Sequence, residues 1–332
     1  MSIIKWFLWP FSLIYSSITD IRNLLFDNGI FESKTFDVNV ICVGNLSVGG
    51  TGKSPMIEYL LNQLKDKYQI AVLSRGYKRQ TKGFIEVLPH HDAENVGDEP
   101  LQFKRKFPNL TICVDVDRRN GISTLLKTHS KTEIVLLDDA FQHRKVKADF
   151  NILLTTYASP FFKDFVLPMG RLRESRSGAK RANAVIVTKC PDKINSVEKQ
   201  KIKAQIKVYS NHEVGFSTIQ YESELINASG KIDFKDFDDF YLITGIANPK
   251  PLLKYLSDHK KTFEHLVFPD HYNFTEKDIN KFKGLSKPIL TTEKDYVRLR
   301  NSLDTNLYYQ PISICVNDLN LTELINKKLQ IS

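Results

Sequence analysis

The sequence lacks several features that would set it apart from ordinary folded proteins. It has no Pro/Gly/Ser-rich tract, no long block of like charge and no internal repeat, so we expect neither a disordered linker nor a repeat architecture. Its four cysteines are far apart, and none has a partner at metal-ligand spacing. This pattern is typical of buried free thiols in a reducing cytoplasm. The 332 residues are enough for two α/β units.

No run of residues is long and apolar enough to predict a membrane-spanning helix. Residues 3–18 are rich in apolar and aromatic side chains, but Lys5, Pro10 and several serines interrupt them, and no cleavage site for a secretory signal follows. From Pro10 onward, apolar residues recur at helical spacing and predict an amphipathic helix over about residues 10–27. Two interpretations remain open, because such a helix can pack on the protein's own core or lie in a membrane interface.

The formal net charge of +9 indicates an anionic partner, such as a phosphate ligand, an acidic membrane or a nucleic acid. The basic residues form small scattered groups, with no continuous basic helix and no aromatic-studded RNA-binding signature. We therefore expect no nucleic-acid partner. No obligatory protein partner is evident either.

A phosphate-binding loop is the strongest signal in the sequence. Residues 40–43 predict a buried strand, residues 56–64 predict an amphipathic helix, and a Gly-rich loop ending in Gly-Lys-Ser lies between them. Lys53 would reach the β- and γ-phosphates of ATP, and the Ser54 hydroxyl would bind Mg²⁺. Glycines allow the N–H groups of the loop to turn toward phosphate oxygens. We predict that ATP binds to Ser47, Val48, Gly49, Gly50, Thr51, Gly52, Lys53 and Ser54.

Two carboxylates follow a second predicted strand at residues 133–137. Asp138 and Asp139 would lie where that strand ends, and we expect one of them to bind Mg²⁺ directly or through water. Gln142 and His143 come shortly afterwards and are candidates for the surroundings of the metal.

A third acidic pair, Asp98 and Glu99, precedes a helical stretch that ends near Lys106. The pair is typical of a helix start, because acidic side chains favour the first turn. A kinase also needs a carboxylate that orients or deprotonates the hydroxyl nucleophile, and Asp98 is an available candidate for that role.

Taken together, the motifs resemble the tetraacyldisaccharide 4′-kinase (lipid A 4′-kinase) family. The similar blocks are residues 44–55, 74–77, 96–100, 138–143, 170–174, 268–272 and 292–295. The resemblance implies transfer of the γ-phosphoryl group of ATP, with Mg²⁺, to the 4′-hydroxyl of a tetraacylated glucosamine disaccharide 1-phosphate in lipid A biosynthesis. It implies a catalytic pair of Asp98 and His271, and a peripheral position on the cytoplasmic face of the inner membrane. Further candidates for contacts with the substrate or around the site are Arg75, Glu99, Arg171, Arg173 and Glu174.

The alternation of predicted strands and helices indicates an α/β fold with mostly parallel sheets covered on both faces. We expect a three-layer P-loop domain over residues 1–155 and a smaller α/β domain over residues 156–315 that contributes His271. The last helix, within residues 316–332, is expected to pack back on the first domain.

Two other functions are compatible with parts of the sequence. A GTPase-type or ATPase-type regulatory P-loop protein needs a guanine-reading motif, and residues 185–192 come close to one, but Asp192 stands one residue too late. A nucleic-acid-stimulated ATPase would account for the positive charge. A strong preference for GTP would favour the first, and stimulation of ATP hydrolysis by DNA would favour the second.

Overall fold

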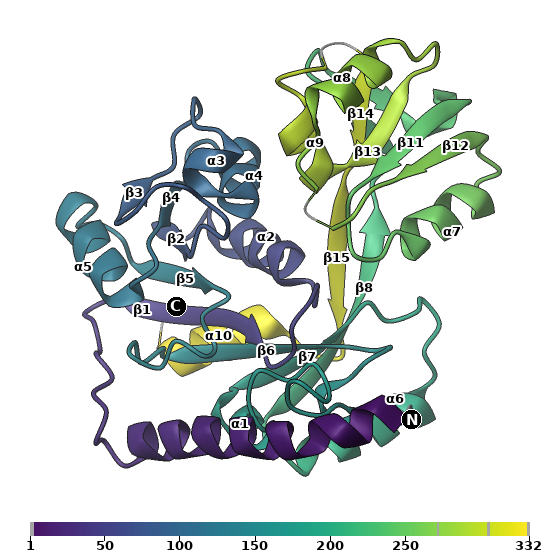
Figure 1. Cartoon of the computed structure of the whole chain (residues 1–332). Helices are drawn as coiled ribbons and strands as arrows, with labels where there is room; N and C mark the ends of the chain where they lie inside the picture. The colour runs from purple at the N-terminus through teal and green to yellow at the C-terminus, as the bar shows by residue number, and fades with distance from the viewer. Residues whose placement is uncertain (1–2, 271, 304–305, 331–332) are drawn as a thin grey trace.

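The structure is a computed structural model that describes residues 3–270, 272–303 and 306–330, without the side chains of residues 3–6. It forms two α/β units that are joined by two long strands (Figure 1). The first unit contains a nine-stranded sheet of order β15-β8-β7-β6-β1-β5-β2-β4-β3, and the second a six-stranded sheet of order β10-β9-β14-β13-β11-β12. The α/β fold class expected from the sequence is confirmed.

The inner strands of the large sheet are parallel, and its edge strands β3 and β15 run antiparallel to their neighbours. In chain order the strands are β1 (Asn39–Asn45), β2 (Ile70–Ser74), β3 (Ile85–Glu86), β4 (Thr111–Val114), β5 (Ile134–Asp138), β6 (Phe150–Thr156), β7 (Ala184–Thr188), β8 (Glu213–Tyr221) and β15 (Ile312–Asn317).

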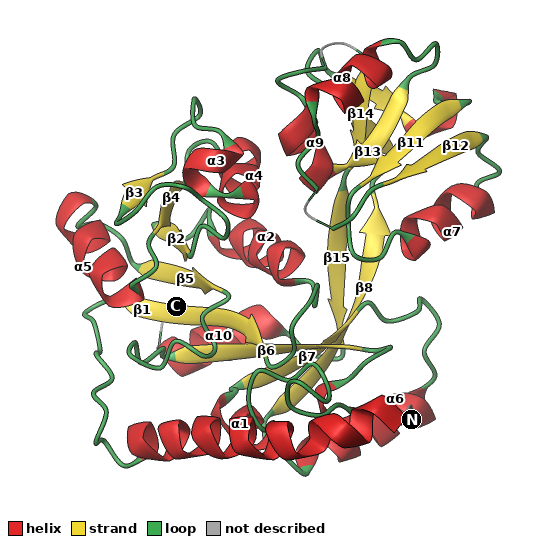
Figure 2. Cartoon of the chain, in the orientation of Figure 1, coloured by secondary structure: helices red, strands yellow, loops and turns green. Residues whose placement is uncertain are grey.

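The centre of the large sheet is buried on both faces. In β1, Val40 and Cys42 belong to the apolar cluster on one face, whereas Ile41 and Val43 belong to the cluster on the other. Side chains alternate along a strand, so an unbroken apolar run is what a strand covered on both faces requires. Figure 2 shows the covering helices in red. They are α2 (Lys53–Leu64), α3 (Ala93–Val96), α4 (Asp98–Lys106), α5 (Arg118–Thr128), α6 (Ser196–Lys207) and α10 (Leu321–Leu329), with short 3₁₀ turns η1 (Phe161–Lys163) and η2 (Arg176–Arg181).

The second unit has its own core on both sides of a smaller mixed sheet. Its central strands β11, β13 and β14 pair in parallel, and β9 and β10 add an antiparallel edge. The strands are β9 (Glu224–Ile226), β10 (Lys231–Asp233), β11 (Phe240–Thr244), β12 (Phe263–Val267), β13 (Ile289–Thr292) and β14 (Leu307–Gln310). The helices are α7 (Lys250–Asp258), α8 (Glu276–Lys283) and α9 (Glu293–Leu299), with the 3₁₀ turn η3 (Phe234–Asp236).

The chain passes between the two units along β8 and β15, which pair from Ile312 opposite Tyr221 to Asn317 opposite Phe216. The sheets therefore divide the chain differently from the expected boundary at residue 155. Strands β7 and β8 follow that residue and belong to the large sheet, while β15 and α10 return to it at the C-terminal end. The side chains of Leu321 and Ile325 from α10 lie in the same core cluster as those of α2. A pattern of alternating elements predicts strands but does not say which sheet each one joins.

The N-terminal helix α1 (Ile3–Asp27) begins before Pro10, which lies inside it instead of in its first turn. Its polar side faces the first unit: Ser12 Oγ donates to Val166 O at 3.0 Å, and Asn23 Nδ2 donates to Glu174 Oε2 at 2.7 Å. The interpretation in which its apolar stripe packs on the protein's own core is therefore wrong. Exposed apolar side chains on this helix are Phe7, Trp9, Phe11, Leu13, Ile14, Ile18, Ile21 and Leu24. Among the described helices, none is long and apolar enough to cross a bilayer.

Candidate active site

The loop between β1 and α2 is folded back by its own side chains and by two glycines with left-handed backbone angles. Gly49 has φ 106° and Gly52 has φ 89°, values that residues with a Cβ rarely adopt. Asn45, fully buried at the end of β1, donates from Nδ2 to Ser47 O and to Thr51 Oγ1, both at 2.8 Å. The sequence thus places a curled loop at the N-terminus of a helix, where N–H groups and the helix dipole favour an anion.

Lys53, the first residue of α2, extends toward the carboxyl end of β5. Its Nζ lies 3.7 Å from Asp139 Oδ2, and Arg173 Nη1 approaches the other carboxylate oxygen at 3.0 Å. Burial acts to raise the pKa of Asp139, but the charges of Lys53 and Arg173 outweigh it and hold that pKa below its ordinary value. Asp139 is therefore ionised beside two cations.

Asp138 has the opposite character, because it is buried and, among the described residues, its side chain accepts a hydrogen bond only from a hydroxyl. Ser74 Oγ donates to Asp138 Oδ2 at 3.0 Å, whereas Asp138 Oδ1 is buried without a hydrogen-bond partner among the described residues. Burial, followed by the charges of Glu99 and Asp139, raises the pKa of Asp138 to about 7. Ser54 Oγ donates to Glu99 Oε1 at 2.9 Å nearby. An oxygen-rich site with an unpartnered buried carboxylate oxygen is suited to a hard cation.

Asp98 lies at the start of α4 and is paired with an arginine from the second unit. Arg298 Nε donates to Asp98 Oδ1 at 3.1 Å, its Nη2 contacts Asp98 Oδ2, and its Nη1 lies 3.5 Å from Asp295 Oδ1. This bidentate pairing fixes the plane of the carboxylate. Arg298 is a residue that sequence reasoning missed, although it stands shortly after the block at residues 292–295. The other predicted catalytic residue, His271, lies outside the described residues.

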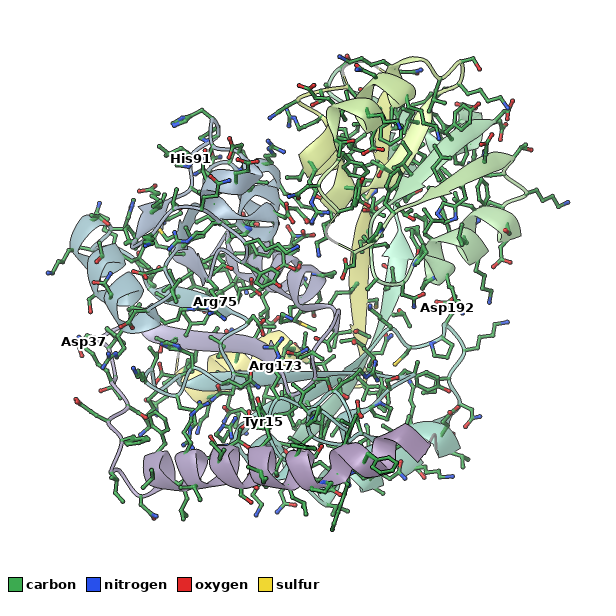
Figure 3. The ribbon with its side chains drawn as sticks, in the orientation of Figure 1. Tyr15, Asp37, Arg75, His91, Arg173 and Asp192 are labelled. Carbon is green, nitrogen blue, oxygen red and sulfur yellow. The ribbon has the colours of Figure 1, made fainter. Side chains whose placement is uncertain are left out.

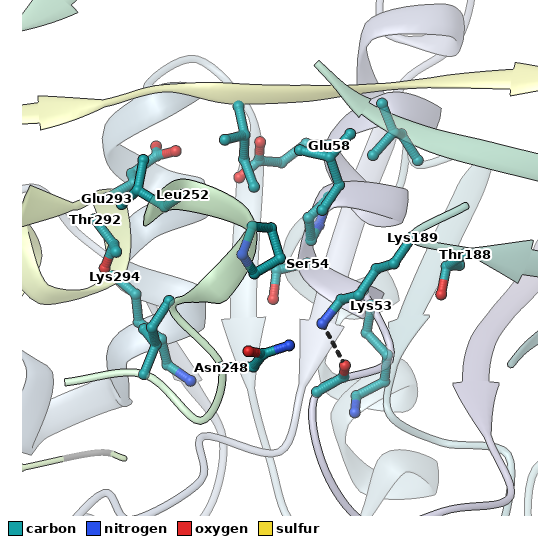
Figure 4. Close-up of a pocket in the computed structure, with 18 of the residues that line it drawn as sticks. Lys53, Ser54, Glu58, Thr188, Lys189, Asn248, Leu252, Thr292, Glu293 and Lys294 are labelled. Atoms are coloured by element: carbon teal, nitrogen blue, oxygen red, sulfur yellow. Dashed lines mark hydrogen bonds between the residues drawn. The ribbon is translucent and has the colours of Figure 1, made fainter. Parts of the chain in front are cut away.

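A cavity of about 260 Å³ opens beside the loop, between the two units (Figure 4). Residues 50–55 form one wall, β8 and β15 form an apolar wall, and Asn248 and Lys294 approach from the second unit. Thr188 and Lys189 at the end of β7 complete it. These four polar residues were not predicted as site residues; for Thr188 and Lys189, the available signal was their position at the end of the apolar run of residues 184–187.

The comparison with known proteins decides the family. A family model described as tetraacyldisaccharide-1-P 4′-kinase (LpxK) matches residues 4–330. The chain belongs to this family. A protein named tetraacyldisaccharide 4′-kinase from Flavobacterium psychrophilum is 51% identical over 96% of this chain and 94% of its own length. A protein of the same name from Flavobacterium johnsoniae is 46% identical over 99% of this chain and 100% of its own length. A crystal structure of LpxK from Aquifex aeolicus in complex with ATP superposes with a TM-score of 0.80 at 30% identity, covering 98% of this chain and 99% of that one.

Membership of the family confirms the resemblance seen in the sequence motifs. The chain is an ATP-dependent lipid A 4′-kinase, a tetraacyldisaccharide 4′-kinase of lipid A biosynthesis. The interpretation as a regulatory GTPase is thereby set aside. Asp192, the residue that would have to read guanine, is exposed in the loop after β7.

Three of the predicted polar residues of the kinase lie together near the end of β1: Gln142, Arg173 and Glu174. Gln142 Nε2 donates to Asn45 O at 2.8 Å and to Glu174 Oε1 at 3.0 Å, and Arg173 Nη1 lies 3.3 Å from Gln142 Oε1. Glu174 is buried and accepts hydrogen bonds from Asn23, Gln142 and Arg181. Figure 3 shows Arg173 between the sheet and α1.

The remaining two arginine candidates of the kinase lie away from that cluster. Arg75 is exposed after β2. Arg171 is exposed as well, and its Nε lies 3.1 Å from Asp164 Oδ2. Among the described residues, neither arginine forms a hydrogen bond with Lys53 or Asp98.

His143 makes the stability of the kinase depend on pH. Burial, reinforced by the charge of Arg118, lowers the pKa of His143 to about 4, although its Nε2 lies 4.0 Å from Asp117 Oδ1. The neutral imidazole is therefore favoured in the folded state. Its contribution to stability is complete above the unfolded pKa near 6.5 and is lost as pH falls toward 4.

We expect His143→Gln to reduce the difference between the free energies of unfolding at pH 7 and pH 5 by about 1–2 kcal/mol. Urea unfolding at the two pH values measures this difference. His90→Gln, at an exposed position, is the control. An unchanged difference in the His143 variant would show that the imidazole is not held neutral by its surroundings.

Proposed function

We propose that the kinase binds ATP in the cavity beside the loop, with the triphosphate on the loop and Mg²⁺ at the Ser54 hydroxyl and the carboxylates after β5. The observation that carries this is that Lys53, Ser54 and Glu99 line the cavity, while Lys53 and Glu99 also lie close enough to Asp138, with its unpartnered oxygen, for their charges to act on it. In the described part of the chain, no three His, Cys, Asp or Glu side chains are grouped closely enough to hold a metal. This fits Mg²⁺, which usually takes its other ligands from phosphates and water.

Asp98 is the carboxylate that we assign to the acceptor hydroxyl. It directly precedes Glu99, which lines the cavity and whose carboxylate accepts a hydrogen bond from Ser54. Its geometry is fixed by Arg298, whose two contacts orient the carboxylate. Asp98 would orient the 4′-hydroxyl and take up its proton as the oxygen attacks the γ-phosphorus, while Lys53 stabilises the negative charge on the phosphoryl oxygens. Bound Mg²⁺ supplies further neutralisation of phosphate charge. His271 remains the proposed partner of Asp98.

The lipid acceptor is proposed to enter from the face of α1. A cavity of about 560 Å³ beside this helix is lined by Phe26 and Phe31, by the cations Arg22, Arg119 and Arg144, and by Gln142 and His143. Apolar and cationic side chains in one cavity suit a molecule with acyl chains and a phosphate. Gln142 also contacts Asn45 O at the start of the phosphate-binding loop, so this cavity and the loop are neighbours.

The exposed stripe of α1 supports a position on a membrane surface. Ile14 and Ile18 are 60% and 62% exposed, while Ser12 and Asn23 on the other side bond to the first unit. A helix that turns its polar side to the protein and its apolar side outward gains free energy by entering the interface of a bilayer. We propose peripheral binding to the inner membrane on its cytoplasmic face.

We expect Ile14→Glu and Ile18→Glu each to weaken binding to vesicles by about tenfold or more, because each removes an exposed apolar side chain whose transfer into the bilayer would be worth roughly 1.5–3 kcal/mol. Co-sedimentation with vesicles of phosphatidylethanolamine and phosphatidylglycerol measures this. Leu88→Glu is the matched control, since Leu88 is exposed near His91, which Figure 3 shows at the far end of the first unit from α1. Equal sedimentation of all three variants would contradict the membrane role of this helix.

The reaction itself is tested by mass spectrometry of a tetraacyl disaccharide 1-phosphate after incubation with ATP and Mg²⁺. We expect a gain of one phosphate group that is absent after Asp98→Ala or after chelation of the metal. Fragmentation of the product should place the new group on the 4′ oxygen. Phosphorylation that survives both treatments would refute the roles given to Asp98 and Mg²⁺.

A further inference from the structure

Two consecutive carbonyl groups of the phosphate-binding loop are held from the end of β7. Thr188 Oγ1 donates to Thr51 O at 2.7 Å, and Lys189 Nζ donates to Gly50 O at 2.7 Å. Figure 4 shows the second of these bonds as a dashed line at the edge of the cavity. Neither bond takes part in the chemistry described above, and the charged group of Lys189 donates to a backbone carbonyl of the protein.

The effect of these bonds follows from the planarity of the peptide group. The C=O of one residue and the N–H of the next lie in one rigid plane and point in opposite directions. Fixing Gly50 O and Thr51 O toward β7 therefore turns the N–H groups of Thr51 and Gly52 away from β7. Among the described residues, no hydrogen bond occupies those two N–H groups. We propose that Thr188 and Lys189 are positioning residues that aim two loop N–H groups at the phosphates of ATP.

The loop needs such support because packing does not fix it. A Cβ built on Gly49 would meet no atom within 4 Å, and the nearest atom to one on Gly50 is Lys189 Nζ at 3.8 Å. Glycine-rich backbone without packing has many accessible conformations, and ordering it costs conformational entropy. Asn45 holds the inner side of the loop and the pair at β7 holds the outer side. A loop held on both sides binds phosphate without first having to be ordered.

The charges around the cavity agree with this assignment. Lys189 is half-buried, and burial, followed by the repulsion of Lys53 and Lys294, lowers its pKa. Three ammonium groups are thus gathered beside the loop, and an anion bound among them would relieve their repulsion. Lys53 approaches from α2, where the γ-phosphate is proposed to lie, whereas Lys189 approaches the backbone of the loop. The two lysines therefore have different tasks: Lys53 acts on the reacting group, and Lys189 acts on the orientation of the loop.

The inference rests on the proposed placement of ATP on the loop, and it is tested with Lys189→Met and Thr188→Val. We expect each change to raise the KM for ATP by about tenfold, since a hydrogen bond from a charged or well-placed donor is lost. The kcat at saturating ATP and the KM for the lipid acceptor should change by less than about threefold. Lys189→Arg keeps a charged donor and should restore the KM to within about threefold of the unaltered value. Lys193→Met, exposed in the same loop, is the matched control.

Titration with ATP in the absence of acceptor separates the possible outcomes. The inference is supported if Lys189→Met binds ATP more weakly and Lys189→Arg restores the affinity. The unfolding temperature of Lys189→Met without ATP should then equal that of the unaltered protein. Unchanged ATP affinity in Lys189→Met would overturn it, and so would an equal rise of both KM values. If Lys53→Ala also left ATP affinity unchanged, the placement of ATP on the loop would itself be wrong. If only Lys53→Ala lost affinity for ATP, the placement of ATP on the loop would stand and the role given to Thr188 and Lys189 would be refuted.

Discussion

Asp98→Asn is expected to lower kcat of the kinase by about 10²–10⁴-fold, with little change in the affinity for ATP. Asparagine has the shape of the carboxylate but cannot accept the proton of the 4′-hydroxyl. The change also removes the negative charge that Arg298 contacts from the second unit. Steady-state turnover of the lipid acceptor, with ATP binding measured separately, checks both expectations.

Arg298 provides a companion test of how Asp98 is positioned. Arg298→Lys keeps a positive charge but not the two parallel hydrogen bonds, so we expect an intermediate loss of kcat. Glu323→Gln, at an exposed position of α10 and outside this pairing, serves as the control for surface charge. Turnover in Asp98→Asn that remains within about threefold of the unaltered enzyme would remove Asp98 from the chemistry, whatever Arg298 does.

Lys53→Ala is expected to reduce kcat by at least about 10²–10³-fold, because it removes a cation from the oxygen atoms on which charge develops. The fold should survive, since the ion pair that Lys53 makes with Asp139 at 3.7 Å is supplemented by Arg173 at 3.0 Å. Turnover and the unfolding temperature are the two measurements.

The matched control for Lys53 is Lys67→Ala, which removes the same charge from an exposed position just beyond α2. We expect that variant to retain full activity. A fall in activity of equal size in both variants would indicate a general dependence on net charge. Retained activity in Lys53→Ala would exclude the phosphate-binding loop from the mechanism.

Helix α4, which carries Asp98, is held in place by ionic contacts with α9 of the second unit. Besides the pairing of Asp98 with Arg298, Lys106 Nζ bridges Glu58 of α2 at 2.6 Å and Glu293 of α9 at 3.4 Å. Burial and the neighbouring Glu58 raise the pKa of Glu293 to about 7, so this bridge contains one carboxyl that is readily protonated. The helix that carries the proposed catalytic carboxylate is thus tied to both units.

The local parts of the site follow from the sequence of neighbouring residues. Strand, Gly-rich loop and helix follow one another directly, so the place of the loop and the positions of Lys53 and Ser54 at the start of the helix are encoded within residues 39–64. Asp138 and Asp139 could be placed because parallel strands of one sheet end at the same edge, and β1 indeed pairs with β5. The family blocks added the function, which the comparisons confirmed.

The tertiary structure alone decided which distant residues meet. Arg298 reaches Asp98 across 200 positions of sequence, and Lys189 reaches Gly50 across 139, and no periodicity encodes such contacts. The same holds for the direction in which α1 faces, because an apolar stripe predicts a buried side without saying what buries it. Local hydrogen bonding and side-chain alternation are set by neighbours in the chain, whereas pairing between units depends on how complete sheets and helices pack.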